Sequence, residues 1–356
     1  MMGHLLHLKQ QDRIGWIGLG EMGCNMVGNL QRYLTSRSLS MTVWNRTPAK
    51  SAKMHQKHGV HVAKSIEDLV AQSNIIFTSL ANDAAVEEIY EILVDLAGQV
   101  DHSIIFIETS TIYPTLATQL QERLAPLPQH TYLQCPVFGR PSAAKAAKLI
   151  WVTSGDEKAI KKMCLYFTTM SKSIIHLKTT DVAKAASFKL VGNFFIAGTL
   201  ELLAEGLSLA EKADVEQEPV LKFIEAFFPT PTWTEYSTKM VPGAGATKTK
   251  SAAKNKQEGG FSVDLGLKDV GHMRRLAEEA GASLPTADLA YDHLMAVKEQ
   301  GKGDQDWSCM IGALRVLTPS SSSRPSEDSS WGTGGSAEVD VKTEEENAQP
   351  PAYESK

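Results

Sequence analysis

Residues 13–46 read RIGWIGLGEMGCNMVGNLQRYLTSRSLSMTVWNR, and this stretch decides the fold. An apolar run, Ile14–Leu19, ends in the glycine pattern Gly18-x-Gly20-x-x-Gly23. A helical pattern follows, and a second short apolar run ends at Trp44. Three glycines alone are a weak signal. The order strand, glycine turn, helix and strand around them is typical of the unit that binds the pyrophosphate of a dinucleotide.

Each glycine of this pattern has a separate physical role. Gly18 permits the tight turn after the strand, Gly20 lets the backbone approach a pyrophosphate, and Gly23 permits close packing of helix and strand. The helix N-terminus adds free N–H groups and a partial positive charge, and both attract an anion. The sequence therefore predicts that the cofactor is bound by the consecutive residues Gly18, Leu19, Gly20, Glu21, Met22 and Gly23.

The end of the second strand bears on the choice between NAD and NADP. Proteins that bind NAD place Asp or Glu there, to accept a hydrogen bond from the ribose 2′-hydroxyl. Here Asn45 occupies this place, and Arg46 and Thr47 follow. A guanidinium beside a neutral residue suits a 2′-phosphate, which it can hold with two parallel hydrogen bonds. We therefore expect NADP in preference to NAD; the alternative is that Arg46 is an ordinary exposed residue at a helix start.

Beyond this unit, strand and helix patterns alternate as far as residue 177. Continuous apolar runs predict buried strands, and capped amphipathic patterns predict helices. The alternation is typical of a parallel sheet with helices on both faces. The predicted strands are 60–62, 74–80, 103–107, 130–135, 150–154 and 173–177, and the predicted helices are 47–57, 83–97, 113–123, 156–167 and one that begins at 65.

From residue 181 the pattern becomes helical throughout. Residues 181–212 form one long apolar-rich stretch without proline, and shorter helices are predicted at 220–228, 267–280 and 287–300. The sequence thus predicts an α/β Rossmann domain that binds NADP over residues 12–178. An all-α domain over residues 179–318 follows, and the long helix joins the two. The segment 241–260 is rich in Gly, Ala and Lys and is interpreted as a surface loop.

The composition is ordinary for a globular protein of 356 residues, with 42% hydrophobic and 22% charged residues. The net charge of −5 resides in residues 319–356, which hold eight acidic and three basic residues and are rich in Ser and Gly. Such a segment predicts a disordered tail. The body is close to neutral and offers no basic surface for nucleic acid or an anionic membrane, so neither partner is expected.

Cysteine spacing and hydropathy suggest where the protein resides. The four cysteines form no C-x-x-C pair and fit no zinc pattern, so we expect no metal and a reduced, cytoplasmic protein. The first 13 residues contain no long apolar run, and no stretch is expected to reach the length of a membrane span.

Lys189 and Asn193 are candidates for chemistry. They lie four residues apart on the long predicted helix, so both side chains occupy one face among apolar neighbours. Burial lowers the pKa of an ammonium group toward the range in which it exchanges protons near neutral pH. Hydride transfer at an alcohol carbon needs such a base for the hydroxyl proton. The alternative is a surface lysine that extends its charge to solvent.

The chain resembles the β-hydroxyacid dehydrogenase family over about residues 13–318. Six motifs occur in the family's order. They are G-L-G-x-M-G-x-x-M at 18–26, the acid-strand motif at 108–114 (with Glu108 in place of Asp), K-x-x-x-N at Lys189 and Asn193, the later glutamate at Glu205, F-x-x-x-L-x-L-K-D at 261–269, and G-x-G-D-x-D-x-S at 301–308.

The resemblance implies an active site in the cleft between the two domains. It implies that Lys189 is the general acid/base and that Asn193 and Ser110 position the reacting group. It further implies that the cofactor is lined by Leu80, Ala81, Ala85 and Thr111 and is reached by Lys268 from the second domain. A homodimer or homotetramer is expected.

One loop departs from the family. The family's pattern D-A-P-V-S-G-G is replaced by Gln-Cys-Pro-Val-Phe-Gly-Arg, with Phe138 at the serine, Gly139 retained and Arg140 at the second glycine. These three are the candidate substrate residues. Arg140 either holds a carboxylate or ties the loop down, and both alternatives stay open. Phe138 is expected to make the pocket more apolar.

The sequence therefore predicts an NADP-dependent oxidoreductase. Hydride would move between the nicotinamide and a small hydroxy acid, semialdehyde or keto acid, with Lys189 as proton carrier. One alternative is a catalytically idle dehydrogenase fold that serves as an oligomeric NADP-binding platform, since a fold alone does not prove activity. The other is a related imine or 6-phosphogluconate-type reductase, which the retained Lys189 disfavours.

Overall fold

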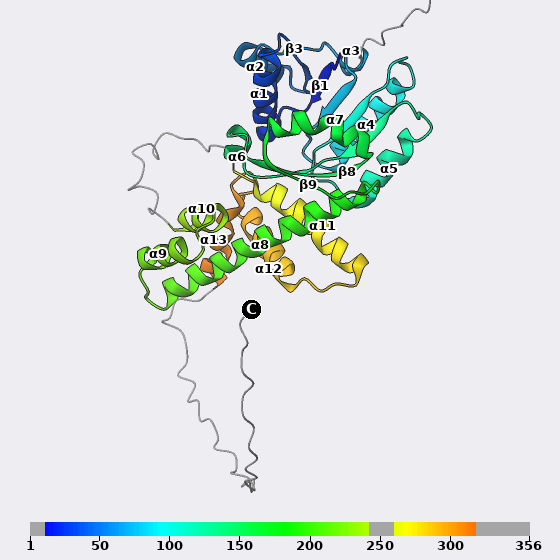
Figure 1. Cartoon of the computed structure of the whole chain (residues 1–356). Helices are drawn as coiled ribbons and strands as arrows, with labels where there is room; N and C mark the ends of the chain where they lie inside the picture. The colour runs from blue at the N-terminus through cyan, green and yellow to red at the C-terminus, as the bar shows by residue number, and fades with distance from the viewer. Residues whose placement is uncertain (1–10, 242–259, 318–356) are drawn as a thin grey trace, which may run out of the picture. The chain divides into compact units, whose positions relative to one another are not determined.

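The computed structural model describes residues 11–241 and 260–317. The predicted loop at 241–260, apart from its two end residues, and the predicted tail from 319 lie outside the described residues. The described residues form one compact unit. The domain boundary expected near residue 178 therefore stays a prediction, although the secondary structure changes character there (Figure 1).

The N-terminal part contains a sheet with the strand order β3-β2-β1-β4-β5-β6-β8-β7, and β9 pairs with β8. The strands from β3 to β6 are parallel to one another. The strands are β1 (Ile14–Ile17), β2 (Thr42–Trp44), β3 (His61–Val62), β4 (Ile75–Thr78), β5 (Ile105–Glu108), β6 (Thr131–Gln134), β7 (Val137–Phe138), β8 (Leu149–Gly155) and β9 (Ser171–His176).

The prediction of a largely parallel Rossmann-type sheet is confirmed, with one difference. Strand β8 runs antiparallel to both β6 and β7, although it is parallel to β9. An apolar run predicts a strand but carries no information on its direction. The two-residue strand β7, which the sequence did not predict, pairs Phe138 with Ile150 and fixes the backbone of the loop that departs from the family.

Helices cover both faces of the sheet, because successive strand residues point to opposite sides. In β4, Ile75 and Phe77 enter one core and Ile76 enters the other. Trp16 stacks on Phe77 in the first core, with ring centroids 4.9 Å apart. That core is covered by α1 (Glu21–Thr35), α2 (Pro48–His58), α6 (Pro141–Lys145) and α7 (Glu157–Thr168), and the second core by α3 (Ile66–Gln72), α4 (Asp83–Ala97) and α5 (Pro114–Leu124).

The C-terminal part is helical around α8 (Ala183–Lys212), which runs from α5 toward α9 (Figure 1). The predicted long helix is confirmed. Three elements of this part were not predicted: α10, η1 and α13. Helix α11 begins four residues before the predicted 267, because Ser262 caps it. The other elements are α9 (Gln217–Phe227), α10 (Pro231–Met240), α11 (Val263–Ala280), α12 (Pro285–Glu299), η1 (Trp307–Met310) and α13 (Ile311–Leu317).

Helix α8 is long and apolar enough to cross a membrane by length and composition alone, so the expectation that no stretch reaches that length is wrong. Its apolar window is 44% buried, and a core helix can pass the same test. Helix α8 contacts α10, α11, α12 and α13, and it also contacts α5 and β8 of the N-terminal part. These contacts account for the apolar composition of α8 by packing within the protein.

Candidate active site

The glycine turn is built by close backbone contacts. Gly18 has φ +98°, and a side chain there would meet the carbonyl oxygen of Ser79. A Cβ at Gly23 would lie 2.2 Å from the carbonyl oxygen of Gly18, so only glycine permits this approach of α1 to β1. A Cβ at Gly20 would meet nothing within 4 Å. Folding alone does not demand glycine at this helix N-terminus, which fits a ligand approaching the backbone there.

Asn45 holds the glycine turn. Its Oδ1 accepts a hydrogen bond from the backbone N–H of Leu19 at 2.8 Å, and its Nδ2 donates to the carbonyl oxygen of Thr47 at 3.1 Å. Arg46 is exposed directly after β2, and Thr47 precedes α2 without a side-chain capping bond. The side chain of Asn45 at the end of β2 therefore hydrogen-bonds the backbone around the glycine turn, while the guanidinium of Arg46 faces solvent.

Ser110 connects the ends of β4 and β5. Its Oγ accepts from the backbone N–H of Leu80 at 2.7 Å, and its own N–H donates to Oε1 of Glu108 at 2.5 Å. Two other predicted cofactor residues follow Leu80: Ala81 is exposed, and the N–H of Ala85 donates to the capping residue Asn82. The strand ends thus bring Leu80 and Ser110 together, as parallel neighbours in the sheet require.

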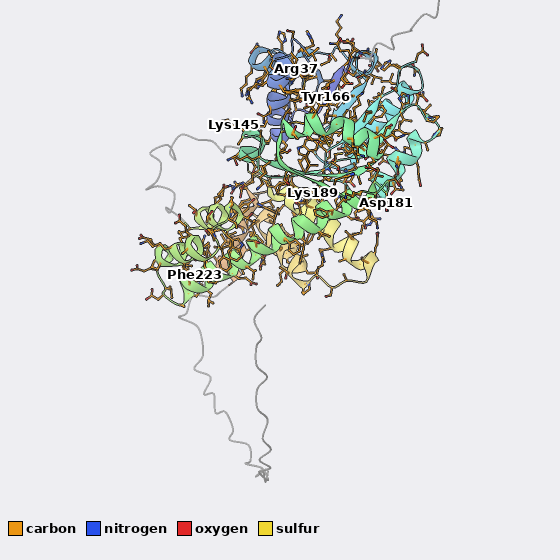
Figure 2. The ribbon with its side chains drawn as sticks, in the orientation of Figure 1. Arg37, Lys145, Tyr166, Asp181, Lys189 and Phe223 are labelled. Atoms are coloured by element: carbon orange, nitrogen blue, oxygen red, sulfur yellow. The ribbon has the colours of Figure 1, made fainter. Side chains whose placement is uncertain are left out.

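A chain of polar contacts links Lys189 to the sheet. Nζ of Lys189, in the first third of α8 (Figure 2), donates to Oδ1 of Asn193 at 2.9 Å. Nδ2 of Asn193 donates to Oδ2 of Asp269 at 2.6 Å, and Oδ1 of Asp269 lies 3.1 Å from Nζ of Lys268. Lys268 in turn donates to the carbonyl oxygen of Thr111 at 2.6 Å. The lysine pair on α8 and α11 is therefore tied to the residue that follows Ser110.

Lys189 has the electrostatics of a proton carrier. Its side chain is 8% exposed. Burial lowers the pKa of Lys189 from its usual value to about 8; Asp269 opposes this change and Lys268 adds to it. A group with such a pKa is present in both protonation states near neutral pH, which general acid/base chemistry requires.

Phe138 lies over this lysine. Nζ of Lys189 is 4.2 Å from the centroid of the Phe138 ring, within the range of a cation–π contact. The ring also meets the edge of Phe188, with centroids 6.2 Å apart. Gly139 follows with φ +137°, and a side chain there would meet Leu149. The loop therefore presents an aromatic ring, held by β7, to the one face of α8 that carries Lys189.

Arg140 is engaged by carboxylates of the helical part. Its guanidinium lies 2.5 Å from Oε2 of Glu235 and 3.7 Å from Oδ2 of Asp306, and it faces the ring of Tyr236 at 4.8 Å. Asp306 also pairs with Lys239 at 2.7 Å. Of the two alternatives for Arg140, these contacts match the one in which it ties the loop to α10 and the segment before η1.

Two family models cover most of the chain. Residues 13–178 match the NAD-binding domain of 6-phosphogluconate dehydrogenase, and residues 183–314 match the NAD-binding domain of NADP-dependent 3-hydroxyisobutyrate dehydrogenase. The chain belongs to the β-hydroxyacid dehydrogenase family. Its homologues are named oxidoreductases and 3-hydroxyisobutyrate dehydrogenases, so the chain is an NAD(P)-dependent dehydrogenase or reductase of the CH–OH class.

Relatives of this β-hydroxyacid dehydrogenase align over nearly their whole length. The mitochondrial 3-hydroxyisobutyrate dehydrogenase of Drosophila melanogaster is 27% identical over 85% of this chain and 89% of its own. The NADH-dependent oxidoreductase ucdB of Aspergillus ustus is 28% identical over 83% and 96%. The solved structure of Mycobacterium tuberculosis 3-hydroxyisobutyrate dehydrogenase with L-serine has a TM-score of 0.70, at 28% identity over 86% of this chain and 99% of that one.

Three residues of this candidate site were not among the site residues predicted from the sequence. Asp269 is 1% exposed and accepts a hydrogen bond from Asn193. It is the last residue of the F-x-x-x-L-x-L-K-D motif, and this position could have identified it as a candidate. Glu108 is fully buried and bonds Ser110, and its place in the acid-strand motif was visible too. Gly192 stands out in the sequence as a glycine inside the long helical stretch, which predicts a close contact, but its partner Phe138 could not be predicted. Glu205 is exposed, and the buried glutamate of α8 is Glu201, whose carboxylate lies 2.6 Å from Nδ1 of His293.

Proposed function

We propose that this protein is an NADP-dependent oxidoreductase that interconverts a small carbonyl compound and its alcohol, with Lys189 as the general acid/base. The single observation that carries the proposal is the buried Lys189, whose Nζ is held by Asn193 and whose pKa burial lowers to about 8. The bound cofactor supplies the hydride for reduction of the carbonyl carbon. Lys189 donates the proton to the carbonyl oxygen, and in the reverse direction it takes the proton from the hydroxyl group.

The neighbouring residues hold this lysine and the reacting group in place. Asn193 accepts from Lys189 and is itself fixed by Asp269, so the ammonium keeps one direction. The hydroxyl of Ser110 accepts from Leu80 and also hydrogen-bonds the carboxyl group of Glu108, so its oxygen is held beside the proposed position of the reacting oxygen. Relatives named for 3-hydroxyisobutyrate and for glyoxylate or succinic semialdehyde support a small substrate.

Substitution of Lys189 by Met tests the proposal. Methionine keeps the length of the side chain and cannot carry a proton, so kcat should fall by roughly 10²–10⁴-fold. The kcat/KM of the parent for alcohol oxidation should rise with pH to a plateau above about 8, because the base must be deprotonated, and this limb should vanish in the variant.

The matched control is Lys184→Met, an exposed lysine on the same helix with a loose 3.8 Å contact to Asp181. It should leave both kcat and the pH profile unchanged. A Lys189→Met variant within threefold of the parent would rule out Lys189 as the proton carrier. Loss of cofactor binding or of folding in that variant would instead favour a structural lysine and the idle-platform alternative.

The preference for NADP rests on Asn45 and Arg46. No carboxylate stands at the end of β2 to meet a ribose 2′-hydroxyl, and the guanidinium of Arg46 is exposed there. Arg46→Ala should weaken NADPH binding by about 30-fold through loss of a charge-assisted contact of ~2 kcal/mol, and NADH binding by much less. Titration of both cofactors by fluorescence measures this, with the exposed Lys57→Ala on α2 as control. Equal affinity of the parent for both cofactors would contradict the assignment.

The chain is also proposed to self-associate. Phe188, Phe195, Leu202 and Leu209 recur every seven residues on α8, and their exposed fractions are 36%, 67%, 57% and 70%. A row of large apolar side chains along one helix face is costly in water and is typical of an interface. A second copy of the chain offers the same row, which can meet itself across a twofold axis.

A further inference from the structure

The ring of Phe138 stands where a substrate must approach Lys189. Its centroid is 4.2 Å from Nζ, the atom that would exchange the proton. The backbone of Phe138 cannot easily withdraw, because it pairs with Ile150 in the β7–β8 ladder. The edge contact with Phe188 on α8 extends the apolar surface beside the lysine. The wall next to the proton carrier is therefore aromatic and offers no hydrogen-bond donor.

Gly192 makes room for this ring. A Cβ on Gly192 would lie 2.3 Å from Cζ and 2.4 Å from Cε1 of Phe138, far inside van der Waals contact. Gly192 is on α8 between Lys189 and Asn193, in the interior of a 30-residue helix, where glycine is less favourable than alanine. The glycine and the aromatic ring therefore form one unit: the ring can adopt this position only because position 192 carries no side chain.

The neighbouring cations are already paired. The guanidinium of Arg140 meets the carboxylates of Glu235 and Asp306. The ammonium of Lys268 meets Asp269 and the carbonyl oxygen of Thr111. Lys189 itself is required as the proton carrier. A substrate carboxylate placed against Phe138 would lose its hydration with no free cation among these three residues to replace it, and such a loss is strongly unfavourable.

Resting on the proposed function, we propose that Phe138, seated on Gly192, determines specificity: the enzyme selects small carbonyl compounds with an uncharged, apolar substituent over those with a carboxylate. An alkyl group buried against Phe138 is stabilised by the removal of each of its CH₂ groups from water. A carboxylate gains nothing there and leaves its charge without a partner.

The first test compares two aldehydes of similar length. Pentanal and succinic semialdehyde carry the same reacting group, and only the second ends in a carboxylate. The parent enzyme with NADPH should show a kcat/KM at least tenfold higher for pentanal. The reverse preference would overturn the inference and leave the proposed function standing, whereas no reduction of either aldehyde, with NADPH or NADH, would overturn both.

Two substitutions at position 138 separate specificity from structure. Phe138→Ser should lower the pentanal to succinic semialdehyde ratio by about tenfold, because the apolar wall is lost. Phe138→Leu keeps an apolar wall and should retain the ratio within threefold. A merely structural role would lower both substrates equally and leave the ratio unchanged in both variants, and that result would overturn the inference.

A double-mutant cycle tests the unit formed by Phe138 and Gly192. Gly192→Ala alone should displace the ring and lower kcat/KM for pentanal by at least tenfold. In the Phe138→Ser background the methyl group meets no ring, so the same change should have less than a threefold effect. Independent, additive effects of the two substitutions would show that the ring does not occupy the position described, and would overturn the inference.

Discussion

At the scale of single residues, Glu108 is the buried carboxyl group on which the strand ends converge. Its Oε2 accepts from the hydroxyl of Thr78 at 2.6 Å, and its Oε1 accepts from the N–H of Ser110. Burial raises the pKa of Glu108 to about 7, and the hydrogen bonds from Ser110 and Thr78 oppose part of that change. The carboxyl group therefore changes charge near neutral pH while it positions Ser110.

This pKa makes a prediction about stability. Because the folded-state pKa is raised above the unfolded value of 4.5, the contribution of Glu108 is fully present below pH 4.5 and is lost as pH rises through about 7. Glu108→Gln keeps the shape and removes the charge. The variant should be more stable than the parent by about 2–3 kcal/mol at pH 8 and close to the parent at pH 5.

Urea unfolding at the two pH values measures the difference, and Glu88→Gln, an exposed position on α4, is the control. Subtracting the variant's free energy of unfolding from that of the parent isolates the effect of Glu108 from the effects of the other carboxyl groups. Parallel stability profiles for Glu108→Gln and the parent would show that Glu108 has the same pKa in the folded and unfolded chain.

A contact between two site residues could be predicted from the sequence only where the two residues are near each other in the chain. The spacing of Lys189 and Asn193 predicted a shared helix face, and the two side chains are hydrogen-bonded. Asp269 meets Asn193 from a helix 76 positions away, and Gly192 meets Phe138 from another element. Such contacts depend on tertiary packing, which leaves no periodic signal in one sequence. The role of Arg140 stayed open for the same reason, since Glu235 and Asp306 are distant in the chain.

At the scale of elements, two glycines of the glycine turn are predicted to have different roles: Gly23 in packing α1 on β1, and Gly20 in cofactor binding. Gly23 lies where α1 crosses β1, and its Cβ would meet the Gly18 carbonyl at 2.2 Å, whereas Gly20 faces open space. Gly23→Ala should therefore destabilise the fold by roughly 1–3 kcal/mol through overpacking. Gly20→Ala should leave the melting temperature within about two degrees and weaken NADPH binding at least tenfold, since a methyl group would stand between the backbone and the pyrophosphate.

Thermal unfolding and cofactor titration of the two variants measure these effects, and each variant is the control for the other. A stable Gly23→Ala would mean that α1 can move away from β1 at little cost. Normal NADPH binding by Gly20→Ala would mean that the pyrophosphate does not approach this turn.

The elements that the sequence predicted are those with strong periodicity. Strands β1, β4, β5 and β6 follow continuous apolar runs, and α8 follows a long stretch without proline. Helix α10 was missed because PTWTEYSTKM is polar and rich in β-branched residues, although its Pro at the first position is a helix signal. It is stabilised by a contact from outside the helix: Nε1 of Trp307 donates to the hydroxyl of Tyr236 on α10 at 2.9 Å.

At the scale of the whole molecule, α8 packs against both the N-terminal sheet part and the C-terminal helical part of the chain. Its first turns pack on α5 and the sheet, and its later turns form the core of the helical part with α10, α11 and α12. The sequence predicted this helix from its apolar composition but not which of its faces is buried, because it is apolar nearly all round. Only the structure separates the buried face from the exposed row of Phe188, Phe195, Leu202 and Leu209.

Self-association through that row is the prediction that belongs to this scale. Leu209 is 70% exposed, so Leu209→Lys should cost a monomer well under 1 kcal/mol, whereas in a twofold interface the change would bury two charged groups among apolar side chains. The parent should elute at a multiple of 38.8 kDa in size exclusion with light scattering, and Leu209→Lys should shift it toward the monomer mass.

The control is Leu165→Lys, which changes an equally apolar side chain that is 54% exposed on α7, away from the α8 row, and should leave the mass unchanged. A monomeric parent would contradict self-association outright. An oligomer that survives Leu209→Lys, alone and together with Phe195→Lys, would place the interface on another face. Because the row includes Phe188, which meets the Phe138 ring, loss of the oligomer should also raise KM for apolar aldehydes if the partner copy supports that wall.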